Sequence, residues 1–163
     1  MSYAYFAYGS NLDAAHFVAW CGEHGYAGVS LERGAHAELD DWELTLTVPS
    51  RYWGGAVGTI RPRQGGLVHG VMFTLDDAAA PVIRHKEGVT TGLYREVEVE
   101  VRAGGTAGGT MYLRTASVFV AADGREVALG SMAPSARWLE TVRAGGAKHG
   151  LSQRWLDHLG KGT

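Results

Sequence analysis

The chain has 163 residues, of which 45% are hydrophobic, and its 15 basic and 17 acidic residues give a formal net charge of −2. A chain of this length and hydrophobic content can bury a core as a single domain over residues 1–163, and it is excluded from the intrinsically disordered class. There is no basic excess to neutralise phosphates, so we expect no nucleic-acid partner.

The cysteine count and the N-terminus indicate the compartment. Cys21 is the only cysteine, and one cysteine forms neither an internal disulfide nor a cysteine-rich zinc site. We find neither a signal-peptide pattern nor an apolar run of roughly 18 residues. We therefore expect a soluble cytoplasmic protein without a membrane partner. The abundance of alanine, glycine and arginine over lysine is typical of a GC-rich bacterial genome.

The first half of the chain predicts mainly strands. Residues 3–8 form an aromatic-rich run typical of a strand, which stops at a glycine turn. Asn11 is the expected N-cap of a helix over residues 12–20. Further strands are expected at 29–39, 42–48, 56–60 and 67–74. The proline and glycines of residues 62–66 predict a hairpin turn between the last two.

The second half predicts the remaining strands and most of the helices. A helix capped by Asp76 or Asp77 should run to about Lys86 and end at Gly88. Valine and glutamate alternate in a strand over 93–102, a glycine loop follows at 104–109, and strands are expected at 111–113 and 118–120. Helices capped by Ser135 and Ser152 end the chain. This order predicts an α+β fold: a mixed, mostly antiparallel β-barrel or sheet flanked by short helices.

Several familiar catalytic patterns are absent. The glycine clusters lack the Gly-Lys-Ser/Thr of a P-loop, and no helix follows residues 104–109 as a dinucleotide site requires. Ser10 lies on a turn between strand and helix, but the Gly-x-Ser-x-Gly pattern is missing. The seven histidines are scattered without ligand spacing, so we predict no metal site and no cofactor.

Two segments could carry chemistry. In the first, Tyr8-Gly9-Ser10-Asn11-Leu12, a strand enters a glycine turn and a helix begins, which would point free backbone N–H groups at a carboxylate or an oxyanion. The alternative is a structural turn with Asn11 as its cap. In the second, Glu87 stands at a predicted helix end, where the helix carbonyls would raise its pKa to suit a general base. The alternative is a solvated surface glutamate paired with Lys86 or Arg84.

These segments resemble the γ-glutamylcyclotransferase superfamily. Residues 5–12, Tyr-Phe-Ala-Tyr-Gly-Ser-Asn-Leu, match its signature almost letter for letter. Similar stretches follow in the family's order at 53–60, 68–71, 87–89, 92–94, 134–135, 146–147 and 150–151. Two features depart from the family: His85 and Lys86 make the segment before Glu87 more basic than is usual, and Trp138 replaces a common tyrosine. They leave the identity of the substrate open.

The resemblance implies a γ-glutamylcyclotransferase-like fold and a cofactor-independent enzyme of transferase or lyase type. Its substrate would be a small-molecule γ-glutamyl amide, whose α-amine attacks the γ-carbonyl to give 5-oxoproline and a free amine. By resemblance, Glu87 is the catalytic acid and base. The substrate-binding residues would be Tyr8, Gly9, Ser10, Asn11, Leu12 and Tyr94. For Tyr94, a hydroxyl donor in the pocket and packing in the core are both open.

Other functions remain open at this stage. The protein could be a non-catalytic binding or regulatory module that keeps the fold, or it could remove a γ-glutamyl protecting group from a biosynthetic intermediate. A hydrolase that releases free glutamate is a third alternative. The leaving amine cannot be read from the sequence. The five tryptophans, Trp53, Trp138 and Trp155 among them, would suit either the core or a dimer face, so a homodimer is also open.

Overall fold

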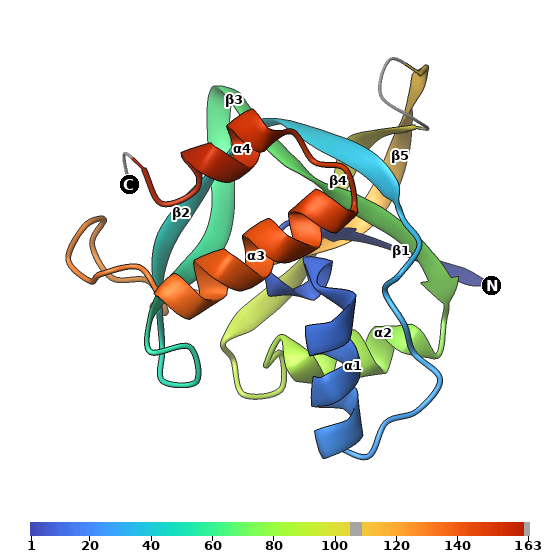
Figure 1. The fold of residues 1–163 in the computed structure, drawn as a ribbon, viewed down its shortest axis with the longest axis horizontal. Helices are drawn as coiled ribbons and strands as arrows, with labels where there is room; N and C mark the ends of the chain where they lie inside the picture. Colours follow the sequence, from blue (N-terminus) through green and yellow to red (C-terminus); the bar gives the residue numbers. More distant parts are fainter. Residues whose placement is uncertain (105–108, 162–163) are drawn as a thin grey trace.

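A closed β-barrel forms the centre of the computed structural model, which describes residues 1–104 and 109–161 (Figure 1). Within these residues the strands are β1 (Ser2–Ala7), β2 (Ala35–Ser50), β3 (Gly55–Asp76), β4 (Tyr94–Gly104) and β5 (Met111–Ala121). They are ordered β1-β3-β2-β4-β5, and the neighbours are antiparallel except β1 and β5. Those two close the barrel through one registered parallel pair, Tyr5 with Ser117. The expected α+β class, with a mostly antiparallel barrel, is confirmed.

The strands are longer than the sequence predicts. The expected hairpin turn at 62–66 is wrong, because β3 continues through it while its pairing with β2 shifts register between Asp40 and Trp42. The extra residues form a bulge. Asp41 and Gly65 adopt φ of 62° and 79°, and the Gly65 N–H donates to Asp41 Oδ1 at 2.9 Å. Because this hydrogen bond joins β2 and β3 at the bulge, β3 continues in the same direction after it. The chain reverses direction earlier, at residues 51–54, between β2 and β3.

Other predicted boundaries also merge or move. The strands expected at 111–113 and 118–120 are one strand, β5, and residues 29–34 of an expected strand lie outside β2. Residues 105–108 of the expected glycine loop lie outside the described residues. In β4, Val99 and Val101 are buried while Glu98 and Glu100 are exposed, so the alternation read from the sequence is confirmed.

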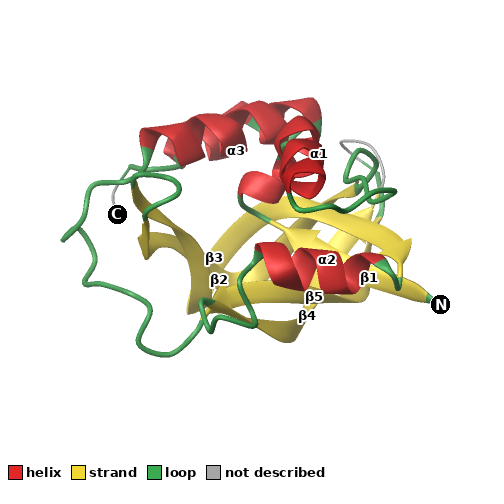
Figure 2. Cartoon of the chain, turned by 90° about the horizontal axis from the view of Figure 1, so that it is seen from below, coloured by secondary structure: helices red, strands yellow, loops and turns green. Residues whose placement is uncertain are grey.

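The helices are η1 (Ser10–Leu12), α1 (Ala14–Glu23), α2 (Ala79–Lys86), α3 (Ala136–Lys148) and α4 (Gln153–His158). Figure 2 shows α1 and α3 together on one side of the barrel. Ser135 and Ser152 cap α3 and α4 as predicted. The predicted cap of the first helix is wrong: Asp13, not Asn11, accepts from the His16 N–H. None of the helices in the described residues is long and apolar enough to cross a membrane.

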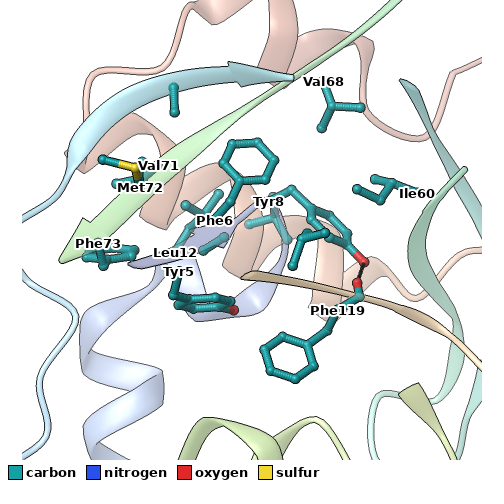
Figure 3. Close-up of a cluster of buried hydrophobic side chains, with 14 of the residues drawn as sticks. Tyr5, Phe6, Tyr8, Leu12, Ile60, Val68, Val71, Met72, Phe73 and Phe119 are labelled. Atoms are coloured by element: carbon teal, nitrogen blue, oxygen red, sulfur yellow. Dashed lines mark hydrogen bonds between the residues drawn. The ribbon is translucent and has the colours of Figure 1, made fainter. Parts of the chain in front are cut away.

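The aromatic strand β1 lies in the middle of the core. Tyr5 and Phe6 are buried together with Phe73 of β3 and Phe119 of β5 (Figure 3). Burying an aromatic side chain stabilises the fold by about 2–3 kcal/mol, so this strand is firmly held. The loop that follows β1 therefore begins from a fixed point. Trp138 and Trp155 are also buried and Trp53 is partly buried, so these three tryptophans contribute to the core.

Candidate active site

Glu87 lies at the C-terminal end of α2, as the sequence predicts. It is the C-cap residue, and its N–H donates to the Ile83 carbonyl at 2.9 Å. The next residue, Gly88, has φ +67°, a conformation that glycine adopts readily, and the helix stops there. This ending turns the Glu87 side chain toward the loop after β1.

Asn11 holds the Glu87 carboxyl group. Its amide nitrogen Nδ2 donates to Glu87 Oε1 at 2.8 Å and to the Tyr5 hydroxyl at 2.9 Å. A carboxylate accepts but does not donate, so the amide must turn its nitrogen toward Glu87. Asn11 is 2% exposed, and its Oδ1 is buried without a hydrogen-bond partner in the described part of the chain. Asn11 thus joins β1 to the end of α2, and this is why it does not cap a helix.

Burial raises the pKa of the Glu87 carboxyl group above its ordinary value. The nearby Lys86 ammonium, together with contacts from Tyr5 and Asn11, opposes this shift without cancelling it. Burial and the Glu87 charge also raise the pKa of Tyr5 and Tyr8 well above the usual range, so both phenols stay protonated. Among Tyr5, Tyr8 and Glu87, Glu87 is therefore the group whose raised pKa suits exchange of a proton with a ligand.

The alternative of a solvated surface glutamate is wrong. Arg84, one of its expected partners, instead forms an ion pair with Glu96 of β4. Lys86, the other expected partner, forms no ion pair in the described residues. Its charge acts on Glu87 only through space. Glu87 is partly exposed as a residue, but its carboxyl group faces a cavity in the protein.

The cavity beside Glu87 has a volume of about 30 Å³ and is lined by most of the residues that the sequence singled out. These are Tyr8, Gly9, Ser10, Asn11, Glu87 and Tyr94. Leu12 is not among the lining residues. It is 1% exposed and lies under α3, where a Cβ on Gly145 would come within 2.3 Å of the Leu12 carbonyl carbon. The sequence missed Tyr5, Phe6, Gly58, Phe119 and Trp138 as lining residues.

The two tyrosine hydroxyls in the cavity wall already donate to the backbone. Tyr94 OH donates to the Gly58 carbonyl at 2.7 Å. Tyr8 OH donates to the Phe119 carbonyl, also at 2.7 Å (Figure 3). Tyr94 thus packs in the wall and lines the pocket at once, but its proton is committed to Gly58. We infer that both phenols shape the cavity and are free only to accept hydrogen bonds from a ligand.

The loop after β1 presents backbone donors at the cavity. The N–H groups of Ser10 and Asn11 have no acceptor within residues 1–104 and 109–161. The expected contribution of a helix dipole is smaller than predicted, because only the three-residue η1 follows directly and α1 begins at Ala14. Ser10 and Asn11 both line the cavity, as the sequence predicts.

Trp138 forms the opposite wall. The Ser135 N–H donates to the Ala56 carbonyl at 2.8 Å, which fixes the start of α3 against β3. The indole then lies over the backbone of two glycines: a Cβ would lie 3.2 Å from it at Gly9 and 2.5 Å from it at Gly58. The spacing of Gly58 and Trp138 in the sequence gives no sign of this contact, which depends on the placement of α3.

A second pocket of about 280 Å³ opens beside the first and shares Ser10, Glu87, Tyr94 and Trp138 with it. Its outer wall adds Trp20, Tyr52, Trp53 and Lys86. Lys86, one of the two basic residues that depart from the superfamily pattern, therefore lines the pocket next to Glu87. A ligand that spans both pockets would place its reacting bond near Glu87 and its far end among aromatic rings and an amine.

The prediction that the histidines are scattered is wrong for two of them. His36 and His69 lie far apart in the sequence, but the antiparallel register of β2 and β3 brings them beside Glu38. The spacing along the chain could not show this, because it depends on which residues the two strands pair. This cluster contributes no residue to the cavity at Glu87.

Comparison with known proteins identifies the family of this chain. Residues 67–159, more than half of the chain, match the model of the AIG2-like family. The chain belongs to the AIG2-like family. A bovine γ-glutamylcyclotransferase is 31% identical over 106 residues, which are 61% of this chain and 52% of that protein. The chain thus spans about half the length of the curated relative it matches.

Solved structures show that this AIG2-like protein has the γ-glutamylcyclotransferase-like fold. A γ-glutamyl cyclotransferase superposes with a TM-score of 0.74 at 24% identity, covering 98% of this chain and 86% of the other. An uncharacterised human protein gives 0.72 at 25% identity, with coverage of 97% and 86%. YkqA from Bacillus subtilis gives 0.76 at 24% identity, covering 97% of this chain and 52% of that one. The resemblance to the superfamily is confirmed.

Proposed function

We propose that this AIG2-like protein is a γ-glutamylcyclotransferase-type enzyme that converts a γ-glutamyl amide into 5-oxoproline and a free amine. The observation that carries the proposal is the Glu87 carboxyl group, which is buried, has a raised pKa and is held by Asn11 in a cavity that also receives the loop after β1. The kinship with γ-glutamylcyclotransferases supports it.

The chemistry needs a base and a bent substrate. The carboxylate of Glu87 takes a proton from the substrate's α-ammonium group, and the freed amine attacks the γ-carbonyl carbon. A C–N bond forms, and the carbonyl oxygen takes the negative charge. When this intermediate collapses, the original amide C–N bond breaks and Glu87 returns its proton to the departing nitrogen. The Glu87 carboxylate then takes the second proton from the ring nitrogen and passes it to the released amine, which leaves as an ammonium ion, so the lactam is neutral and Glu87 is again ionised. The attacking and leaving groups both belong to the substrate, so the protein needs no nucleophile of its own.

Three features of the cavity suit these steps. The unpartnered Asn11 Oδ1, next to Glu87, can accept a hydrogen bond from the α-ammonium group. The free N–H groups of Ser10 and Asn11 can bind either the substrate carboxylate or the oxyanion. The walls formed by Tyr8, Tyr94 and Trp138 hold the glutamyl chain bent, and confining an intramolecular reaction in this way supplies several kcal/mol of the barrier.

The second pocket indicates the leaving group. Lys86 lines it and has no ion pair in the described residues, so a carboxylate on the leaving group would give its amine a partner. Trp20, Tyr52 and Trp53 offer aromatic surface to a side chain. We therefore propose an amino acid or short peptide with an apolar or aromatic side chain as the leaving group. Polycationic amines and aminoglycosides would meet Lys86 with like charge.

Product analysis tests this proposal. The full chain is incubated with γ-glutamyl amides that carry amino acids, neutral amines or polyamines, and the products are separated. We expect 5-oxoproline together with the free amino acid, and none of either from Glu87→Gln. Free glutamate would instead indicate a hydrolase, and saturable binding without turnover would indicate a non-catalytic module. Turnover of amine conjugates alone would favour removal of a γ-glutamyl protecting group.

A further inference from the structure

Two histidines and a glutamate meet on the paired strands β2 and β3. His36 and Glu38 are two residues apart on β2 and so share one face of the strand. His69 of β3 is registered directly opposite Glu38, which places it on the same face. All three side chains are partly buried and line a groove that lies away from the cavity at Glu87.

The distances between these groups suit a shared ligand better than direct bonds. One ligand atom from each residue can be chosen so that all three lie within 4.8 Å of one another. Glu38 Oε1 and His69 Nδ1 are 3.8 Å apart, too far for a hydrogen bond. Ligand atoms in a tetrahedral zinc site are about 3.4 Å apart. Small side-chain rotations would bring the three ligand atoms from their present distances to this separation.

His69 supplies an independent sign. Its Nδ1 is buried and has no hydrogen-bond partner in the part of the chain that the structure describes. A buried nitrogen left unpaired is unfavourable by about 1–3 kcal/mol. The imidazole of His69 packs against the ring of Trp155, and the two ring centroids are 5.0 Å apart.

A hydrogen bond from Arg102 orients the Glu38 carboxylate. Arg102 donates to Glu38 Oε2 at 2.7 Å and also bonds to Asp40, so Oε2 is committed and Oε1 is left toward His69. Hydrogen bonds of this kind orient carboxylate ligands in metal sites. The two carboxylates and one guanidinium of this group leave one net negative charge, which attracts a cation.

We propose that His36, Glu38 and His69 bind a divalent transition-metal ion of the zinc type. Two imidazoles and one carboxylate are a donor set that suits Zn²⁺, whereas Mg²⁺ and Ca²⁺ prefer oxygen ligands alone. Three protein ligands leave a fourth position for water or a small anion from the groove. The ion would link β2 to β3 near the start of α4. This site is separate from Glu87 and does not depend on the proposed function.

Titration of the metal-free full-length protein with Zn²⁺ tests the site. We expect one equivalent to bind, and Co²⁺ to give the visible absorption bands of a four-coordinate site with nitrogen ligands. Glu38→Gln keeps the shape of the side chain and its bond from Arg102 but weakens the ligand. It should lower the affinity by more than about 10-fold, as should His36→Ala and His69→Ala, because loss of even a group that supports a ligand costs about that much. His24→Ala and Glu100→Gln, which alter exposed residues that do not contact His36, Glu38 or His69, should leave the affinity unchanged.

The variants distinguish loss of a metal ligand from loss of the fold. Circular dichroism of each variant first establishes that it is folded, and Glu38→Gln decides the matter if a histidine variant is not. The proposal is wrong if the wild-type protein binds no Zn²⁺, or if the affinity is the same in the folded Glu38, His36 and control variants.

Discussion

Replacing Glu87 by glutamine should separate activity from stability. The glutamine oxygen can still accept the 2.8 Å hydrogen bond from Asn11 Nδ2, so the cavity keeps its shape. The amide cannot take a proton from the substrate's ammonium group. Loss of a general base lowers rates by about 10²- to 10⁴-fold, equivalent to roughly 3–5 kcal/mol in the barrier. We therefore expect kcat/KM to fall at least about 100-fold.

The free energy of unfolding should not fall in Glu87→Gln as the activity does. Burial raises the pKa of Glu87 in the folded protein above the value of 4.5 expected in the unfolded chain. Between these two pKa values the folded state binds more protons, so the free energy of unfolding decreases as the pH rises through this interval. Above it, the ionised wild-type carboxylate carries a constant destabilisation that glutamine lacks. At neutral pH the variant should be at least as stable as the wild type.

Two measurements check this reasoning. The first follows 5-oxoproline release over a range of pH, where the wild-type rate should fall on the acid side with a pKa above 4.5 and the variant should lack this limb. The second compares thermal unfolding of the two proteins at acid and neutral pH. A folded Glu87→Gln protein that keeps more than about a tenth of the wild-type rate would refute the assignment, since the loss would be less than about 10-fold where at least about 100-fold is expected.

Three further perturbations address the rest of the site. Lys86→Met should lower kcat/KM about 10- to 100-fold more for a γ-glutamyl amino acid than for the matching decarboxylated amine conjugate, because only the first loses a charged hydrogen bond while both lose the Lys86 charge beside Glu87. Equal losses on both would contradict the role given to Lys86. Gly9→Val should severely reduce turnover, because even a Cβ there would come 3.2 Å from Trp138, whereas Ser10→Ala should have little effect; an equally severe loss in Ser10→Ala would mean that the hydroxyl takes part. Acetylation of the substrate's α-amine should abolish turnover, and EDTA should not slow the native reaction; cleavage of the acetylated substrate would identify water as the attacking group.

Local patterns were enough to predict most of the residues that line the cavity at Glu87. A glycine turn directly after an aromatic strand and a glutamate at a helix end are both properties of a few neighbouring residues. The structure brings them together through Asn11, whose side chain reaches Glu87 across 76 positions of sequence. The sequence assigned Asn11 to a helix cap because a cap is the commonest local use of asparagine before a helix. The tertiary contact with Glu87 overrides that preference.

The parts that could not be predicted depend on register and on packing between distant elements. The proline and glycines of residues 62–66 are typical of a reversal, but Asp41, on the neighbouring strand, stabilises a bulge instead. The convergence of His36 with His69 requires the pairing of β2 with β3. The contact of Trp138 with Gly58 requires the placement of α3. None of these partners lies within a helical turn or a strand repeat of the other.

The closure of the barrel has a consequence for its motions. β1 and β5 share one registered pair, whereas β2 and β3 are paired along most of their length. Backbone amides should exchange with deuterium fastest where the fewest hydrogen bonds must break, which is along this seam. Tyr5, which contributes that pair, also carries the hydroxyl that receives a hydrogen bond from Asn11. Opening of the seam would leave β1 paired with β3 but would separate it from β5, whose Phe119 lines the cavity and accepts from Tyr8, so mild denaturant should lower turnover before it unfolds the chain.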